Sequence, residues 1–271
     1  MTKDEQWLLE EKYGGKESAA YKADKGRLAR GEPLAYVIGS QPFLGLKIFL
    51  DSHPLIPRPE TEWWTEQLLN TLASQKPEES FSVARLSRAA RSAAENGSAD
   101  ERPIRFLDLC AGSGAIGCAA LAKLPNVHVS FGEIDPAHEA TIWKNIRENN
   151  LDDARADVRI GDLFEPFGTM TFDVIAANPP YVPAGRTLPR SVADYEPPRA
   201  FLAGEDGLNV LRRIARELPN YLAKSGVAWV ECDRENTEAT RALFSEQGLN
   251  ALIRTDQYGK PRIIVAAFPN I

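Results

Sequence analysis

The sequence predicts an α/β fold with a mostly parallel, doubly wound sheet. After Pro103, short apolar runs typical of strands alternate with helical segments, from IRFLDL and GAIGCAALAKL to the closing run RIIVAAF. This alternation implies right-handed crossovers between parallel strands. Ligands of such sheets bind at the carboxyl ends of the strands, so the residues that follow each strand are the candidates for a site.

Composition restricts the class of protein. The chain has 271 residues, 43% hydrophobic and 26% charged, which is enough to bury a core. Its net charge of -6 provides no general attraction for phosphate backbones, so we expect no directly bound nucleic acid. The three cysteines form no CxxC pair and the three histidines lack metal-ligand spacing, which indicates reduced thiols and no metal. With an acidic start and no long apolar run, we expect a cytoplasmic protein without membrane contact.

The chain divides into four regions. Residues 1–30 are dense in charge and predict a short helical N-terminal region. Residues 31–73 predict a β-hairpin, rich in β-branched and aromatic residues, followed by a connecting helix over 61–73. Residues 74–102, rich in Ser, Ala, Glu and Arg, predict a linker or surface insertion, and 103–271 form the main α/β domain.

The first crossover, FLDLCAGSGAIG, indicates a cofactor site. Its two glycines allow a sharp turn and close approach of a ligand, but the GxGxxG triplet of dinucleotide-binding proteins is absent. A carboxylate at Asp108, just before the loop, would repel a pyrophosphate and suits an ammonium or sulfonium group. This combination favours S-adenosylmethionine as the cofactor. The loop residues predicted to bind it are Cys110, Ala111, Gly112, Ser113 and Gly114.

The next two strands also lead to carboxylates. Glu133 ends the strand VHVSFGEI and can accept both hydroxyls of a ribose. Asp135 competes for this role, but its place before Pro136 is typical of a helix N-cap. In GDLF, Asp162 can accept from an adenine amino group while Leu163 packs beside the ring. Each residue alone could serve a turn or a cap, but their order after successive strands favours one cofactor site.

The segment AANPPYV ends the fourth strand and indicates the chemistry. Pro179 and Pro180 fix φ near about -65° and lack N–H groups, so the loop is stiff and presents acceptors. The Asn178 side-chain oxygen and the Pro179 carbonyl can each accept one N–H of a planar amine, which stabilises the positive charge that grows on nitrogen during methyl transfer. Tyr181 supplies a flat surface for the substrate. We predict that residues 178–181 are catalytic and that Asn178 also contacts the cofactor.

With these motifs, the chain resembles the HemK family of glutamine methyltransferases, which modify the Gly-Gly-Gln loop of peptide chain release factors. The resemblance covers about residues 31–268 and rests on GEPLAYVIG, LIPRPETE, DLCAGSGAIG, NPPYV, YEPPRAFLAGEDGL and DQYGKPRIIVAAF. It implies a small helical N-terminal domain, a β-hairpin and a Rossmann-like seven-stranded methyltransferase sheet whose last strand is antiparallel. The family's cofactor loop falls on 110–114, its ribose carboxylate on Glu133, its adenine-side residue on Leu163 and its substrate loop on 178–181.

The resemblance also implies S-adenosylmethionine as cofactor and a peptide chain release factor as protein partner, and we expect a monomer. This chain departs from the family in three respects. Cys110 stands where the first loop glycine is usual, the N-terminal domain is shorter, and residues 74–102 have no counterpart.

Three alternatives remain open. A related enzyme methylates a glutamine of a large-subunit ribosomal protein, but it usually carries Arg-Ser-Pro where residues 58–62 read RPETE. DNA adenine and some RNA guanine methyltransferases share the Asn-Pro-Pro-Tyr loop, yet they need basic grooves or an added recognition domain, which this acidic chain does not plainly show. A regulator without activity would not need an intact loop.

Overall fold

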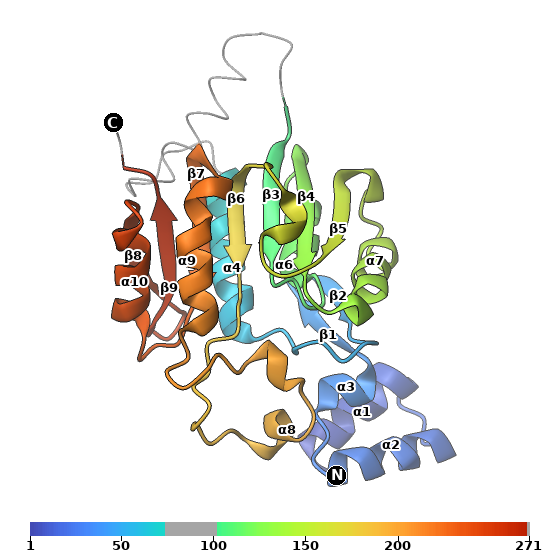
Figure 1. Cartoon of the computed structure of the whole chain (residues 1–271). Coiled ribbons are helices and arrows are strands. Elements are labelled where there is room, and N and C mark those ends of the chain that lie inside the picture. The colour runs from blue at the N-terminus through green and yellow to red at the C-terminus, as the bar shows by residue number, and fades with distance from the viewer. Residues whose placement is uncertain (74–101, 270–271) are drawn as a thin grey trace.

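The computed structural model describes residues 1–73 and 102–269 (Figure 1). Within these residues, a seven-stranded sheet is formed by β3 (Ile104–Leu109), β4 (Val127–Glu133), β5 (Ala156–Ile160), β6 (Phe172–Ala177), β7 (Leu222–Glu231), β8 (Asn250–Thr255) and β9 (Pro261–Ala267). Their order is β5-β4-β3-β6-β7-β9-β8. The first five are parallel, and β9 runs antiparallel to both β7 and β8. The predicted fold class is confirmed, including the antiparallel last strand.

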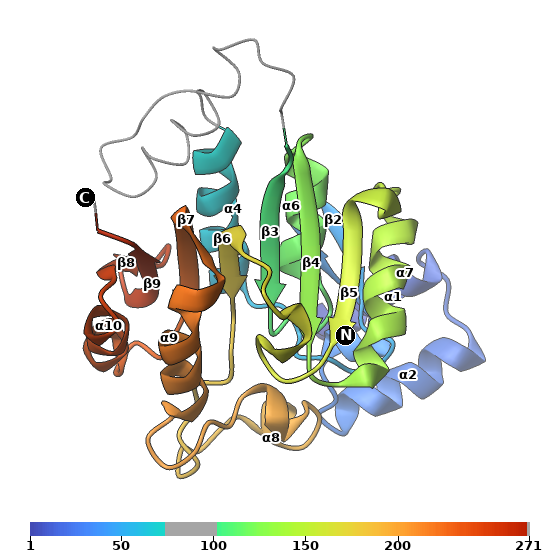
Figure 2. The same cartoon turned by 45° about the horizontal axis from the view of Figure 1, so that its top comes forward.

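Helices cover both faces of the sheet (Figures 1 and 2). One face carries α4 (Pro59–Ala73), α6 (Ala115–Lys123) and α7 (Glu139–Glu148), and the other carries α9 (Asn209–Tyr221) and α10 (Thr237–Glu246). Neighbouring strand residues alternate between the two cores, with Phe106 on the first face and Leu107 on the second. Because both faces are covered, the central strands are almost continuously apolar, which is why the sequence shows them so clearly.

The N-terminal region folds into two helices, α1 (Lys3–Tyr13) and α2 (Ala19–Ala29), and a third short helix, α3 (Leu34–Ile38), packs against them. They enclose a small core of their own, formed by Leu8, Tyr21 and Val37. Asp24 of α2 links this helix to α1. Its carboxylate accepts hydrogen bonds from two side chains of α1, each at 2.7 Å, and from one side chain of α2 at 3.0 Å. The three donors are Lys12, Tyr13 and Arg27.

The hairpin segment is shorter than the sequence predicts. Its strands are β1 (Ser40–Phe43) and β2 (Leu46–Phe49), and α3 occupies the segment before them. Pro33, whose φ is -56°, precedes α3, and Gly39 ends it at a φ of 95° that favours glycine. The hairpin packs on α7, where Asn145 Oδ1 accepts from Phe49 N at 2.7 Å.

The predicted connecting helix is present as α4. Apart from Arg102, the predicted linker at 74–102 lies outside the described residues. No helix among the described residues is long and apolar enough to cross a membrane.

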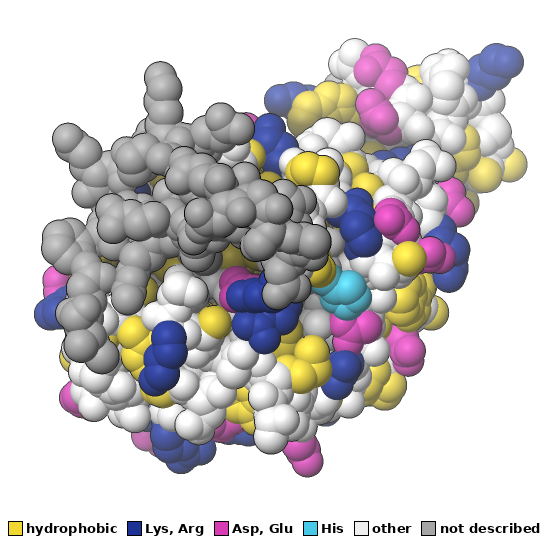
Figure 3. All heavy atoms as spheres, turned by 90° about the horizontal axis from the view of Figure 1, so that it is seen from above, with side chains coloured by type: hydrophobic (Ala, Val, Ile, Leu, Met, Phe, Trp, Pro, Cys, Tyr) yellow, Lys and Arg dark blue, Asp and Glu magenta, His cyan; other side chains and the backbone are white. Residues whose placement is uncertain are grey.

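The carboxyl ends of the parallel strands point toward α1–α3 and the short α8 (Arg190–Ala193) (Figure 1). On the opposite face, seen from above, acidic and basic side chains are intermixed outside the grey atoms, and no single-sign field stands out (Figure 3).

Candidate active site

Each of the five parallel strands carries a carboxylate or amide at or just after its carboxyl end. Asp108 is the penultimate residue of β3, Glu133 ends β4, Asp162 follows β5, Asn178 follows β6, and Glu231 ends β7. Because the strands are parallel, these side chains gather at one edge of the sheet. Sequence reasoning identified the first four and missed Glu231, although the same strand-end rule points to it.

A cavity at this edge brings together about half of the predicted site. The predicted residues that line it are Cys110, Gly112, Glu133, Asp162, Leu163, Asn178 and Pro180. Those that do not line it are Asp108, Ala111, Ser113, Gly114, Pro179 and Tyr181. The cavity wall also contains residues that sequence reasoning did not select, among them Leu55, Ile134, His138, Leu202 and Arg213.

The glycine-containing loop turns through left-handed backbone conformations. Gly112 and Gly114 have φ values of 56° and 76°, and Cys110 has a φ of 61°. Cys110 therefore adopts a left-handed conformation that glycine takes more readily, and a side chain in this conformation costs about 1–2 kcal/mol. Leu163, which lines the same cavity, is also left-handed at φ 51°. Such strain is typical of ligand sites. Burial raises the pKa of the Cys110 thiol well above its usual range, so the thiol stays protonated.

Asp108 lies beneath this loop and is fully buried. Its Oδ2 accepts from Gly117 N at 2.8 Å in the first turn of α6, whereas no described residue donates to Oδ1. Burial raises the pKa of this carboxyl well above its usual value. Gly117 also lets α6 pack closely against β4, because a Cβ there would lie 2.2 Å from the Phe131 ring. A buried carboxyl oxygen without a partner suits a cationic group nearby, and direct contact of Asp108 with the cofactor remains a prediction.

Glu133 is buried and holds the cavity floor together. Its Oε2 accepts from Gly112 N at 2.7 Å, and its Oε1 accepts from Asp135 N at 2.9 Å. A carboxylate offers about four acceptor positions, so two remain for a ligand. The Asp135 side chain accepts from Ala137 N at 2.9 Å, directly before a helical turn that starts with Pro136. The N-cap predicted for Asp135 is confirmed.

Asp162 has a partner that sequence reasoning missed. Its Oδ2 accepts from Arg213 Nη2 of α9 at 2.9 Å, and both side chains line the cavity. Oδ1 makes no hydrogen bond to a described residue. The proposed contact between Asp162 and an adenine amino group therefore stays a prediction that the geometry permits.

The Asn-Pro-Pro-Tyr loop offers two oxygen acceptors. Asn178 Nδ2 donates to Thr61 Oγ1 of α4 at 3.1 Å, and no described residue donates to Asn178 Oδ1 or to the Pro179 carbonyl oxygen. Both oxygens can therefore accept hydrogen bonds from a substrate. Since Asn178 lines the same cavity as Glu133, the acceptor site and the candidate cofactor site are continuous.

Both the side chain and the backbone of Tyr181 make close contacts. Its hydroxyl donates to Glu231 Oε1 at 2.8 Å, and burial together with this carboxylate raises the pKa of the phenol well above its usual value. Gly207, at φ 77°, lies so close that a Cβ would meet the Tyr181 carbonyl oxygen at 2.4 Å. The ring is outside the cavity lining, so its contact with a planar substrate stays a prediction.

A further buried carboxylate joins two walls of the cavity. Glu196 accepts from Ile56 N at 3.1 Å and from Arg58 Nη2 at 2.6 Å. It thereby ties the wall that contains Leu55 to the segment that leads to Leu202. The sequence signal was present in the motifs LIPRPETE and YEPPRAFLAGEDGL, but their contact depends on the tertiary fold.

Comparisons with known proteins show what this chain is similar to. A family model described as Methyltransferase small domain matches residues 75–193. A release factor glutamine methyltransferase of Geobacter sulfurreducens is 32% identical over 92% of this chain and 78% of that protein. One of Thermodesulfovibrio yellowstonii is 32% identical over 88% of this chain and 77% of that protein. The crystal structure of the hMettl16 catalytic domain in complex with a MAT2A 3'UTR hairpin covers 84% of this chain and 77% of that chain at a TM-score of 0.53 and 16% identity, which shows a shared fold.

The fold and the relatives together define an S-adenosylmethionine-dependent methyltransferase. The chain's residues fit this cofactor, since Glu133 keeps two acceptor positions at the cavity and the buried Asp108 keeps an oxygen to which none of the described residues donates. The chain belongs to the family of release factor glutamine methyltransferases.

Proposed function

We propose that this enzyme methylates the side-chain amide nitrogen of the glutamine in the Gly-Gly-Gln loop of a peptide chain release factor. The observation that carries the proposal is a pair of acceptors, Asn178 Oδ1 in the cavity lining and the Pro179 carbonyl next to it, that receive no hydrogen bond from any described residue. The relatives are named release factor glutamine methyltransferases, which supports a glutamine of a release factor as the substrate.

The chemistry follows from the electronic structure of an amide. Its nitrogen shares the lone pair with the carbonyl and is a weak nucleophile. When Asn178 and Pro179 accept its two N–H groups, they stabilise the positive charge that develops on nitrogen and hold the lone pair in line with the methyl donor. S-adenosylmethionine supplies a methyl group bound to a positively charged sulfur. The amide proton is lost after nitrogen becomes acidic, so no general base is required beforehand.

The substrate class follows from access. A glutamine side chain has to leave its own protein surface to reach the cavity edge, which an exposed, glycine-flanked loop allows. In this proposal residues 103–271 form the methyltransferase domain, and the segment that follows the hairpin forms a wall of the substrate channel through Leu55. Helices α1–α3 contact the body of the factor. The enzyme acts as a cytoplasmic monomer without bound nucleic acid, and its three unpaired cysteines support that location.

The test uses labelled S-adenosylmethionine with intact release factors, a large-subunit ribosomal protein, free glutamine and duplex DNA. We expect a mass increase of one methyl group on the Gly-Gly-Gln peptide of a release factor, very poor reaction with free glutamine and none with DNA. A release factor with the glutamine of this loop replaced by alanine is the matched control. Methylation of DNA adenine or of the ribosomal protein, with no mass change on the Gly-Gly-Gln peptide, would overturn the proposal.

A further inference from the structure

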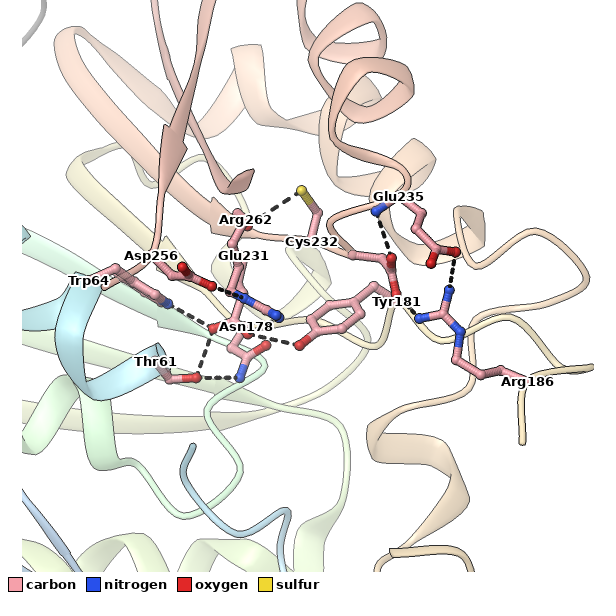
Figure 4. A network of polar contacts seen from close by, with 11 residues as sticks. Thr61, Trp64, Asn178, Tyr181, Arg186, Glu231, Cys232, Glu235, Asp256 and Arg262 are labelled. Carbon is pink, nitrogen blue, oxygen red and sulfur yellow. Dashed lines mark hydrogen bonds and ion pairs between the residues drawn. The ribbon is translucent and has the colours of Figure 1, made fainter. Parts of the chain in front are cut away.

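One buried carboxylate is connected to both polar side chains of the Asn-Pro-Pro-Tyr loop, to Tyr181 directly and to Asn178 through a threonine (Figure 4). Glu231 is fully buried at the end of β7. Its Oε1 accepts from the Tyr181 hydroxyl at 2.8 Å, and its Oε2 accepts from Thr61 Oγ1 at 2.7 Å. Thr61 in turn receives a hydrogen bond from Asn178 Nδ2 at 3.1 Å. The chain of contacts therefore runs from Glu231 through Thr61 to the proposed catalytic amide.

The remaining partners of Glu231 determine the direction of these hydrogen bonds. Trp64 Nε1 donates to Oε2 at 2.7 Å, and Arg262 Nη1 lies 3.8 Å from Oε1. An indole N–H and a guanidinium can only donate, so both carboxylate oxygens face donors. Burial and Glu231 keep the phenol proton on Tyr181 by raising its pKa. Glu231 is therefore an acceptor on both oxygens, and Thr61 must donate to it.

This direction leaves Thr61 only one way to contact Asn178. A threonine hydroxyl has a single proton, and that proton is used on Glu231. Toward Asn178 the hydroxyl presents lone pairs, so the amide must turn its NH₂ group to Thr61. In the flipped amide two oxygens would face each other without a proton between them. The orientation that remains leaves Asn178 Oδ1 free to accept, as a substrate amide requires.

We propose that Thr61, oriented by Glu231, is a positioning residue that fixes the side-chain amide of Asn178 with its oxygen toward the methyl acceptor. The inference rests on the proposed function, because only a substrate that donates N–H groups needs this orientation. Without the hydroxyl of Thr61, the amide is no longer held against rotation, and a fraction of molecules present NH₂ to the substrate.

The test compares two threonines of α4. Thr61→Val removes the hydroxyl at nearly constant volume, and Thr61→Ser keeps it. Thr65→Val is the matched control, because Thr65 is one turn along the same helix, fully buried, and its Oγ1 has no hydrogen-bond partner among the described residues. We expect Thr61→Val to lower kcat by about a hundredfold, with KM for the release factor and affinity for S-adenosylmethionine changed less than about threefold. Thr61→Ser recovers most of the rate, and Thr65→Val keeps the wild-type rate.

A double-mutant cycle with Asn178→Ala separates positioning from a general structural effect. If Thr61 acts through Asn178, adding Thr61→Val to Asn178→Ala causes no further loss of rate. Equal losses in both backgrounds, or wild-type turnover by Thr61→Val, overturn the inference. If Thr61→Val does not fold, Thr61→Ala takes its place in the cycle.

The side-chain amide resonances of Asn178 give a readout that does not depend on the substrate. We expect them to shift in Thr61→Val and to stay unchanged in Thr65→Val. If the Asn178 resonances shift in neither variant, the inference is overturned. If the wild-type enzyme leaves the Gly-Gly-Gln peptide unmodified, the proposed function fails, and these resonances still decide the orientation of Asn178.

Discussion

Glu133→Ala is expected to weaken both the fold and cofactor binding, by amounts that can be measured separately. In the structure the carboxylate accepts from Gly112 N at 2.7 Å and from Asp135 N at 2.9 Å. A hydrogen bond to a charged group contributes about 1.5–3 kcal/mol. Because the freed N–H groups can hydrate through the cavity, the lower value applies to each. The substitution should therefore reduce the free energy of unfolding by about 3 kcal/mol.

The two acceptor positions that remain on Glu133 determine the effect on binding. If they accept two ribose hydroxyls, their loss should weaken S-adenosylmethionine binding by about 2–4 kcal/mol, or roughly 30- to 1000-fold in Kd. Urea denaturation without cofactor measures the first effect. Calorimetry at a temperature where the variant is folded measures the second. Asp135→Asn is the control, since asparagine also caps a helix and both quantities should stay close to wild type.

The two measurements can refute the reasoning independently. A lower unfolding free energy with unchanged Kd for S-adenosylmethionine would show that Glu133 only supports the loop. A weaker Kd in Asp135→Asn instead would transfer the ribose contact to Asp135. An unfolding free energy equal to wild type would contradict the two hydrogen bonds to backbone N–H groups.

Three further predictions concern turnover, acid stability and backbone strain. Asn178→Ala should lower kcat by roughly 100- to 1000-fold while calorimetry shows little change in cofactor affinity, and near-normal turnover would exclude its catalytic role. Burial alone would raise the pKa of Asp24, but hydrogen bonds from three side chains outweigh it and lower the pKa from 3.8 to about 2. A lowered pKa stabilises the fold above pH 3.8, so Asp24→Asn should cost about 1 kcal/mol at pH 7, after allowance for solvent screening, and this difference should shrink as pH falls toward 2 in urea denaturation. Cys110→Gly should be more stable than Cys110→Ala by about 1 kcal/mol in the same assay, because only glycine relieves the left-handed φ; equal stabilities would contradict that strain.

The sequence predicts the central sheet well because the sheet is covered on both faces. IRFLDL is apolar except at Arg105 and Asp108, and it forms β3 with the predicted bounds. The hairpin segment was less predictable. LAYVI has the β-branched and aromatic residues of a strand, yet it forms α3 because Val37 packs against α1 and α2 in the small N-terminal core. Tertiary packing outweighs local propensity over five residues.

Only the part of the candidate site that follows the strands directly in the sequence was predictable. Glu133, Asp162 and Asn178 follow strands directly, and parallel pairing brings them to one cavity. The direction of a side chain was not predictable in the same way. Asp108 points to the first turn of α6, and the hydroxyl of Tyr181 points to Glu231 at the end of β7, because each has a buried hydrogen-bond partner there.

Glu231 shows what the sequence could still have revealed. A glutamate that ends the apolar run GVAWVE in a covered sheet must be buried, and a buried carboxylate requires donors. The requirement is visible in the sequence, but the donors are not, since Thr61 comes from α4 on one face and Arg262 from β9, which returns antiparallel beside β7. The fold thus places a carboxylate with a fixed acceptor role beside a loop whose prolines have no N–H to donate. Its hydrogen bonds reach Asn178 through a single hydroxyl, so the orientation of the proposed catalytic amide depends on a residue 117 positions away in the sequence.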